Sequence, residues 1–174
     1  MARFVALLGG INLGNRRITM DRLRSAVSDL GYDEVSTFIA SGNVLFSAPT
    51  VRDGGDGYAR HLADGLGAAL GWPVPTFVRP AGELLASVDL RPFGPIADGA
   101  THYVVFCAAM PSVDLPALAT DVDRFVLRGR DVHWLIDGRT MDSKVTLPKL
   151  PKLLGQPCTT RNITSAARLA DLLR

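Results

Sequence analysis

A glycine-rich loop near the N-terminus holds the residues of this chain that most suggest chemistry. Its sequence is Gly9-Gly10-Ile11-Asn12-Leu13-Gly14, followed by Asn15-Arg16-Arg17. Backbone N–H groups in such a loop can cradle an anion, and arginines add charge and directed donors. The glycine spacing is that of a nucleotide-binding P-loop, but the Lys-Ser/Thr pair that reaches phosphate and magnesium does not follow. The loop predicts anion binding through Gly10, Gly14, Arg16 and Arg17; the alternative is a tight connection with solvated arginines.

Polar side chains near this loop extend the first candidate site. Asn12 lies between two apolar residues and could either bind a ligand or tie the loop to backbone groups. Ser41-Gly42-Asn43 reads as a hairpin turn, because Gly and Asn tolerate positive φ. If the hairpin lies beside the loop, Ser41 and Asn43 would place polar groups there.

A second polar cluster is predicted in the C-terminal part of the chain. It consists of Ser143-Lys144 and Arg161-Asn162. Lys144 and Arg161 could bind a phosphate or carboxylate, with the planar guanidinium suited to a two-bond grip. The alternative is that Ser143 caps one helix and that Asn162 or Thr164 caps the last one. Because adjacent helical side chains do not face each other, a Ser143/Lys144 catalytic pair is not expected.

Other reactive side chains form no pattern typical of a metal, cofactor or catalytic site. The histidines at 61, 102 and 133 have no partner spacing and are interpreted as structural or surface residues. The only acid near a cluster is Asp142. Cys107 and Cys158 lie in apolar runs and are interpreted as buried, reduced thiols. We therefore predict no metal and no cofactor, and we assign no catalytic residue.

The order of predicted elements is β-α-β-β-α-β, repeated once. In the first half we expect strands at 3–8, 35–40, 44–47 and 73–79, with helices at 20–30 and 58–70. A short helix at 81–88 and a Pro/Gly-rich stretch at 91–100 follow. In the second half we expect strands at 101–109, 124–127, 132–136 and 158–161, with helices at 112–120, within 143–154, and at 164–173.

This order predicts an α+β protein of two consecutive ferredoxin-like (βαββαβ) halves plus a C-terminal helix. The predicted boundaries are 1–79 for the first half, 80–100 for the short helix and linker, and 101–174 for the second half. In a ferredoxin-like half, the loop after the first strand and the hairpin between the second and third strands share an edge of the sheet. Segments 9–18 and 41–43 should therefore meet. Segments 138–144 and 161–162 should share an edge of the second sheet.

Composition and charge restrict the class of protein further. The chain has 174 residues, 47% of them hydrophobic and 21% charged, with a net charge of +2. These are globular values, and the positive charge is weak for a dedicated nucleic-acid binder. No run of about 18 apolar residues is present, and residues 1–8 resemble a strand rather than a signal peptide. We expect a cytoplasmic protein that does not associate with membranes.

Four motifs together resemble domain-of-unknown-function family 1697. They are Leu7–Gly14, Ser41-Gly42-Asn43-Val44, Ser143-Lys144, and Thr160-Arg161-Asn162-Ile163-Thr164. The family's usual first motif is Leu-Leu-Arg-Gly-Ile-Asn-Val-Gly-Gly, so Gly9 stands here in place of an arginine and Asn15 in place of the last glycine. The resemblance implies a bacterial α+β protein and no known reaction. An altered or lost activity is implied if that arginine contributes to a shared site.

The function that these observations favour is binding of an anionic small ligand bearing phosphate or carboxylate. One alternative is an enzyme acting on a phosphorylated or carboxylated metabolite, which lacks a convincing nucleophile or acid/base pair. Another is a nucleic-acid-binding or assembly module. Aromatic residues are only 7% of the chain and RNA-binding sheet motifs are not evident, which favours a small ligand over RNA. The sequence does not indicate an oligomeric state.

Overall fold

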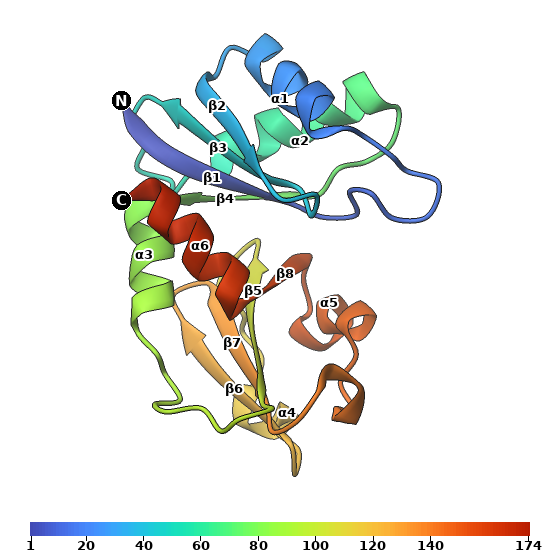
Figure 1. Cartoon of the computed structure of the whole chain (residues 1–174), viewed down its shortest axis with the longest axis vertical. Helices are drawn as coiled ribbons and strands as arrows, with labels where there is room; N and C mark the ends of the chain where they lie inside the picture. The colour runs from blue at the N-terminus through green and yellow to red at the C-terminus, as the bar shows by residue number, and fades with distance from the viewer. The chain divides into compact units, whose positions relative to one another are not determined.

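The computed structural model describes residues 1–174 and contains two four-stranded antiparallel sheets. The strand order is β2-β3-β1-β4 in the first sheet and β6-β7-β5-β8 in the second (Figure 1). Both orders are those of the predicted ferredoxin-like pattern, which is thereby confirmed. The chain divides into two compact units, one comprising Met1–Leu84 and Leu169–Arg174, the other Leu85–Arg168.

The first unit follows the predicted element order closely. Its complete elements are β1 (Ala2–Leu8), α1 (Met20–Asp29), β2 (Asp33–Phe38), β3 (Asn43–Ala48), α2 (Asp56–Leu70) and β4 (Thr76–Pro80). Helix α1 begins as predicted at its N-cap Thr19, whose hydroxyl accepts a hydrogen bond from the Arg22 N–H at 3.2 Å. Helix α2 ends at Gly71, which adopts a left-handed conformation with φ 81°.

The core of the first unit lies between its sheet and the two helices α1 and α2. It combines Phe4 and Phe46 from the strands with Leu23 of α1 and Leu62 and Leu66 of α2. Both helices cover this face in Figure 1. Alternate residues along β1 face the core, so the position of β1 determines where the following glycine loop starts.

The second unit repeats the order with shorter helices. Its complete elements are β5 (Thr101–Cys107), α4 (Leu115–Leu118), β6 (Asp123–Arg128), β7 (Asp131–Ile136), α5 (Leu150–Leu154) and β8 (Cys158–Asn162). Single 3-10 turns form at Thr140–Asp142 and Leu147–Lys149. The core is built on Trp134, Val105 and Val132, packed by Leu115 and Leu150 of the helices.

Helix α4 is much shorter than the helix predicted for 112–120. Only Leu115–Leu118 is helical, with Pro116 in its first turn and an extended Ala119 at its C-cap. Proline is tolerated at the start of a helix because it needs no N–H partner there. The helix therefore begins beside Pro116 and ends as Ala119 leaves helical geometry.

Two helices run across the division between the compact units. They are α3 (Ala81–Asp89), which follows β4, and α6 (Ile163–Leu173), which follows β8. The division falls within each of them, after Leu84 and after Arg168. Residues 169–174 are thus grouped with the first compact unit. The predicted boundaries at 79 and 100, which follow the repeat of element order, stay a prediction.

Candidate functional site

The glycine loop and the β2–β3 hairpin meet at one edge of the first sheet, as predicted. Leu8 donates its backbone N–H to the carbonyl of Gly42 at 2.8 Å, and the Asn12 side-chain amide donates to the carbonyl of Ala40 at 3.1 Å. A Cβ at Gly42 would lie 3.0 Å from the Leu8 Cβ and 3.2 Å from the Ile11 Cβ, and Gly42 has φ 81°. Glycine is therefore required at this contact on both grounds.

Asn12 organises the loop through both ends of its side-chain amide. Its Oδ1 accepts the backbone N–H of Ile18 at 2.8 Å, while its Nδ2 donates to Ala40. Its φ of 56° lies in the left-handed region, where asparagine is favoured among non-glycine residues. Of the two roles predicted for Asn12, the structure shows the tie to backbone groups. Arg17 in turn donates from Nη1 to the backbone carbonyl of Asn12.

A concavity of about 310 Å³ lies where the loop leads into helix α1. It is lined by Asn12, Arg17, Ile18, Thr19 and Arg22. Two arginines and the N-cap of a ten-residue helix thus line one hollow. The sequence prediction included Arg17 but missed Arg22. The signal that could have found it is its position three residues after the N-cap Thr19, within the first turn of α1.

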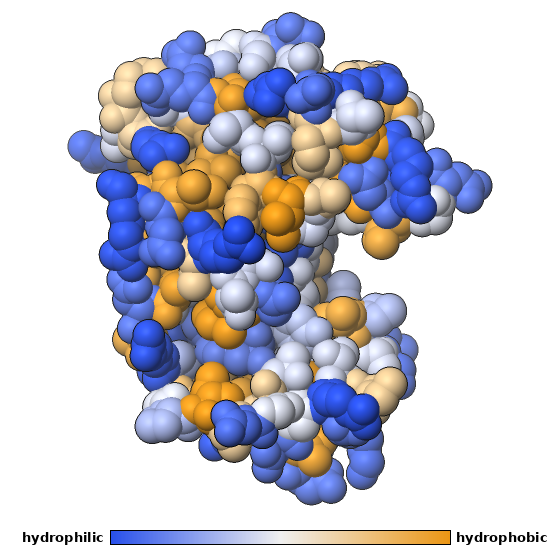
Figure 2. All heavy atoms as spheres, in the orientation of Figure 1, coloured by the Kyte–Doolittle hydropathy of each residue, from blue (hydrophilic) through white to orange (hydrophobic).

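The other loop residues predicted for the site, Gly10, Gly14 and Arg16, do not line this concavity. Gly10 and Gly14 have φ of 68° and 55°, so both adopt the left-handed conformation. A Cβ at Gly10 would lie 3.7 Å from Nη1 of Arg16, which places this guanidinium over the loop backbone. The loop projects from the first sheet in Figure 1, and hydrophilic residues cover most of its tip in Figure 2.

Asn43 and Ser41 hold the hairpin rather than present donors beside the loop. Asn43 is fully buried, and its Nδ2 donates to the carbonyl of Phe38 at 3.0 Å and to the hydroxyl of Ser41 at 2.9 Å. The amide N–H groups of Asn43 are thus used within the turn. The structure therefore brings these residues close to the glycine loop but assigns them to the turn.

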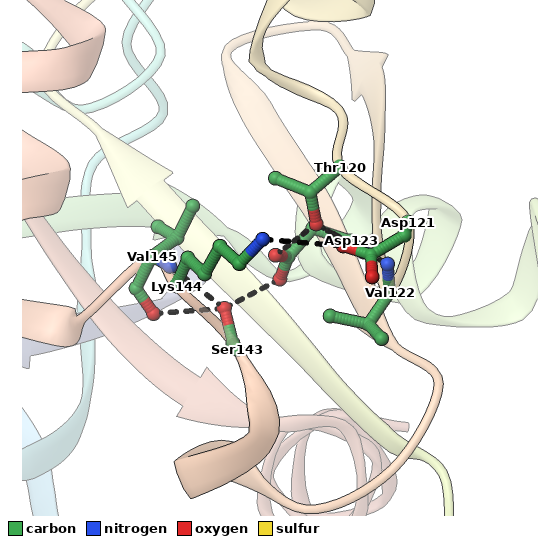
Figure 3. Close-up of polar contacts among 7 residues, drawn as sticks. All are labelled: Thr120, Asp121, Val122, Asp123, Ser143, Lys144 and Val145. Atoms are coloured by element: carbon green, nitrogen blue, oxygen red, sulfur yellow. Dashed lines mark hydrogen bonds and ion pairs between the residues drawn. The ribbon is translucent and has the colours of Figure 1, made fainter.

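In the second unit, Ser143 is bound to a buried carboxylate that the sequence analysis did not identify. Asp123 is fully buried, and its Oδ1 accepts the Ser143 hydroxyl at 2.6 Å and the Trp134 indole N–H at 2.8 Å. Its Oδ2 accepts the Thr120 hydroxyl at 2.6 Å. Figure 3 shows Ser143 directed at Asp123. Ser143 therefore anchors the segment after β7 and does not cap a helix from its N-terminus.

Lys144 is not part of this buried network, although in Figure 3 its side chain extends toward the segment that holds Thr120 and Asp121. Its ammonium lies 3.9 Å from the Asp121 carboxylate, and both side chains are more than three-quarters exposed (Figure 3). The acids close to Ser143 and Lys144 are thus Asp123 and Asp121. Asp142, the acid picked out from the sequence, instead accepts the Arg139 backbone N–H at 2.7 Å.

Arg161 and Asn162 do not join Ser143 and Lys144 in one site. The segment after β7 and the end of β8 share a sheet edge as predicted, since Thr101 and Tyr103 of β5 pair with Ile136 and Asn162 respectively. Arg161 pairs with Val104, however, and so lies on the face opposite Val105, Trp134 and the Asp123 network.

The local contacts of both residues are structural. Arg161 is buried, and its Nη1 donates to the Thr160 carbonyl at 2.9 Å and the Thr159 hydroxyl at 3.0 Å. Burial lowers its pKa to about 10. Asn162 accepts the Ser165 N–H through Oδ1 at 2.7 Å, which confirms the capping role considered for it.

A buried pair of histidines was missed by the sequence analysis. Nε2 of His102 lies 2.9 Å from Nδ1 of His133, and Nε2 of His133 lies 3.2 Å from the Ser87 hydroxyl of α3. All three residues are at most 6% exposed. They come from β5, β7 and α3, so only the pairing of β5 with β7 brings the histidines together. Of the two interpretations given for them, a surface position is thereby excluded, and the histidines do have partners.

Burial keeps both of these imidazoles neutral at ordinary pH. It lowers the pKa of His102 to about 4. Burial also lowers the pKa of His133 to about 4, and electrostatic repulsion from His102 and Arg128 contributes to the same decrease. The remaining nitrogen of His102, Nδ1, is buried without a hydrogen-bond partner. An unpaired acceptor costs less than an unpaired N–H. The favoured arrangement therefore has His102 donating to His133, and His133 donating to Ser87.

The chain matches the family model described as "Protein of unknown function (DUF1697)" over residues 1–133. This is most of the chain. The protein belongs to the DUF1697 family. The matched residues include the glycine loop and the β2–β3 hairpin, whereas Ser143-Lys144 and Thr160–Thr164 lie beyond them. No curated protein matches the chain.

A solved structure resembles this DUF1697 protein over almost its whole length. It is the conserved bacterial protein SP0830 from Streptococcus pneumoniae, with a TM-score of 0.71 and 18% sequence identity. The alignment covers 99% of this chain and 98% of that chain. At this identity the likeness supports the fold.

Gly9 of this DUF1697 chain occupies a position where a side chain fits. Its N–H donates to the Pro75 carbonyl at 2.8 Å, and a Cβ would lie 3.4 Å from the Pro75 Cβ, an ordinary van der Waals contact. Gly9 does not have a positive φ. The backbone therefore accepts the arginine that the family resemblance led us to expect there.

The structure contains no group of three or more histidine, cysteine, aspartate or glutamate side chains arranged to hold a metal ion. None of its helices has the length and apolar character that crossing a bilayer demands.

Proposed function

We propose that this DUF1697 protein binds a small phosphate- or carboxylate-bearing ligand at the concavity between the glycine loop and helix α1. The observation that carries the proposal is the convergence of Arg17, Arg22 and the α1 N-terminus on one hollow of about 310 Å³. That volume is at the low end for ligand sites and suits a small molecule.

The electrostatics of the first turn of α1 favour an anion. The first N–H groups of a helix have no intrahelical acceptors, and they carry the positive end of its dipole. Thr19 caps the N–H of Arg22, which leaves the preceding first-turn N–H groups for a ligand or solvent. Negative charge bound there is favoured by the same field that makes helix N-termini common phosphate sites.

Arg17 is held in position before any ligand arrives. Its Nη1 donates to the carbonyl of Asn12, whose side chain is itself bound at both ends. A guanidinium has five N–H donors, so the others can still contact an anion. Ordering the side chain in advance reduces the entropy lost on binding.

The proposal assigns the anion to the first unit alone. In the second unit Ser143 is bound to Asp123, Arg161 is buried against Thr159 and Thr160, and Lys144 is paired with Asp121. These contacts support structural roles for the second predicted cluster.

The test is thermal unfolding of the full chain with inorganic phosphate, pyrophosphate or citrate, against sodium chloride at equal ionic strength. At least one anion should raise the melting temperature, because a ligand that binds only the folded state stabilises it. Arg17→Ala and Arg22→Ala should each remove most of the shift.

Arg24→Ala is the matched control, because Arg24 lies on the same helix but pairs with Asp21 at 2.8 Å and does not line the concavity. Equal losses in all three variants would contradict a specific site. Retention of RNA that is lost both with salt and in Arg17→Ala would instead favour nucleic acid as the ligand.

The enzymatic alternative gains one observation, the hydrogen bond between Ser87 and His133. The order of the three groups is that of a catalytic triad, but the hydrogen bonds run the opposite way, because in the favoured arrangement Nε2 of His133 donates to Ser87 and cannot accept its proton. Ser87, however, is only 6% exposed. A substrate could not reach its hydroxyl without displacement of α3, so we retain ligand binding as the proposed function.

A further inference from the structure

The two cysteines of the chain lie directly opposite each other in the second sheet. Cys107 ends β5, Cys158 begins β8, and the strand register pairs them. They are far apart in the sequence, so only the fold makes them neighbours. Side chains of directly paired residues lie on the same face of a sheet.

The hydrogen bonds at the end of the β5–β8 ladder show whether Cys107 and Cys158 form a hydrogen-bonded or a non-hydrogen-bonded pair. The next residues, Ala108 and Pro157, are joined by the Ala108 N–H to the Pro157 carbonyl at 3.3 Å. Hydrogen-bonded and non-hydrogen-bonded pairs alternate in an antiparallel ladder, so Cys107 and Cys158 form a non-hydrogen-bonded pair. Cα atoms in such pairs are about 4.5 Å apart, within the roughly 4.4–6.8 Å that a disulfide spans.

The two thiols differ in their access to solvent. Cys107 is fully buried in the core beside Val105 and Trp134. Cys158 packs against the same core but is only partly buried. A reagent from solution would therefore meet Cys158 first, with Cys107 positioned behind it across the ladder.

We propose that Cys107 and Cys158 are a modification site that closes to an intrachain disulfide between β5 and β8. With a disulfide oxidant such as oxidised glutathione, the Cys158 thiolate attacks one sulfur and releases one glutathione thiolate. The Cys107 thiolate then attacks Sγ of Cys158 and releases the second. Two protein thiols are oxidised, one glutathione disulfide is reduced, and the two thiol protons pass to the released glutathione.

Closure should be slow at neutral pH and should strengthen the second unit. Burial raises the pKa of the Cys158 thiol to about 11, so its reactive thiolate is scarce. The rate should rise about tenfold per pH unit below that pKa, because it follows the thiolate fraction. The bond would join β5 to β8, the strand that leads into α6, and such a cross-link restricts the unfolded chain.

The corresponding positions of the first unit carry no cysteines, so the fold itself does not require thiols there. Leu8 and Thr76 pair there, and the Gly9 N–H donates to the Pro75 carbonyl just as Ala108 donates to Pro157. The same ladder position is therefore compatible with a residue pair that has no redox chemistry.

The experiment equilibrates the full chain in glutathione redox buffers, followed by acid quench, alkylation and intact-mass analysis. We expect a monomer that has lost two hydrogen masses and resists alkylation. The equilibrium constant for disulfide formation should be at least about tenfold larger than in urea, because folding raises the effective concentration of one thiol at the other. The oxidised protein should also melt several degrees higher than the reduced protein.

Single variants identify each sulfur's role. Cys107→Ser should stop at a mixed disulfide of Cys158 with glutathione, whereas Cys158→Ser should react little because Cys107 is buried. Three results would overturn the proposal. They are accumulation of the glutathione adduct in the unsubstituted protein, disulfide-linked dimers in place of the closed monomer, and equal equilibrium constants in buffer and urea.

Discussion

The two units use the same strand ladder but place their polar groups differently. In each sheet a buried arginine on the last strand pairs with a valine on the first: Arg79 with Val5, and Arg161 with Val104. Each guanidinium donates from Nη1 to the carbonyl of the preceding residue at 2.9 Å. The repeat therefore extends beyond element order to individual buried contacts.

Aromatic pairs across the central strands show the same correspondence. Phe4 stacks near Phe46 with ring centroids 5.5 Å apart, and Tyr103 lies near Trp134 at 5.3 Å. Each pair is a direct cross-strand pair in its sheet. Such pairs stabilise a sheet by packing large apolar areas against each other.

The two units differ in where their polar side chains lie. His133 of the second sheet pairs with Val104, whereas Leu45 pairs with Val5 at the corresponding place in the first. The first unit also buries Arg79 and Asn43, but it has no counterpart of the buried histidine pair or of Asp123 with its three side-chain partners. Its polar groups around Asn12 and Arg17 lie instead at the rim of the sheet. A shared ladder does not imply a shared site.

The largest effect that would test this comparison is loss of the buried carboxylate of the second unit. Asp123→Ala leaves the Trp134 N–H and the Ser143 and Thr120 hydroxyls without their acceptor. We expect a loss of about 3–5 kcal/mol in the free energy of unfolding, measured by urea denaturation. Asp33 of the first unit begins β2 as Asp123 begins β6 but is exposed, so Asp33→Ala should cost under about 0.5 kcal/mol. Similar losses in both variants would remove the contrast between the units.

Acidification should weaken the second unit through its histidines. Their pKa values are about 4 when folded, against about 6.5 for an unperturbed histidine, so the unfolded chain binds more protons between these pH values. The contribution of the histidines to the free energy of unfolding is therefore fully present above about pH 7. It falls as the pH drops toward 4, by up to about 1.4 kcal/mol per pH unit for each histidine.

Each unit contains one tryptophan, so the fluorescence of one tryptophan reports the unfolding of one unit. Trp134 fluorescence in a Trp72→Phe variant reports urea unfolding of the second unit at pH 7, 6 and 5. Replacing His102 and His133 together by leucine should flatten the pH dependence over this range. An unchanged slope in that double variant would show that other groups cause the acid sensitivity.

A smaller effect is expected at the rim of the first unit. Asn12→Ala removes the acceptor of the Ile18 N–H and places alanine at a φ of 56°. We expect a loss of about 1–3 kcal/mol by urea denaturation. Asn12→Asp keeps the acceptor and should retain much of that stability. If Asn12→Ala costs nothing, the loop does not depend on this side chain and Arg17 is not held by it.

The smallest effect is expected at Lys144. Its ion pair with Asp121 is long and exposed, so Lys144→Ala should change the free energy of unfolding by less than about 0.5 kcal/mol. It should also leave any phosphate-dependent thermal shift intact. A shift lost in Lys144→Ala but kept in Arg17→Ala would reverse the assignment of the site between the units.

The sequence could predict the elements because their signals are local. Thr19 caps α1, Gly71 ends α2, and the alternation of apolar residues marks the strands. The meeting of the glycine loop with the hairpin could also be predicted, since it follows from strand order alone. Helix α4 is shorter than predicted because Pro116 lies in its first turn and Ala119 leaves helical geometry.

What could not be predicted depends on register and side-chain direction. The contact of His102 with His133 exists because β5 and β7 pair in one register among several that the sequence permits. The separation of Arg161 from Ser143 depends on which sheet face each occupies. Strand alternation shows that neighbouring residues diverge, but it does not show which segment covers each face.

The proposed function depends most directly on where the anion binds, which an NMR titration would test. The full chain, labelled with ¹⁵N, would be titrated with inorganic phosphate at constant pH and ionic strength. We predict saturable changes of amide shifts concentrated in residues 12–22, and absent there in Arg17→Ala. Changes concentrated around Lys144 and Arg161, or small unsaturable changes spread over both units, would contradict the proposed site.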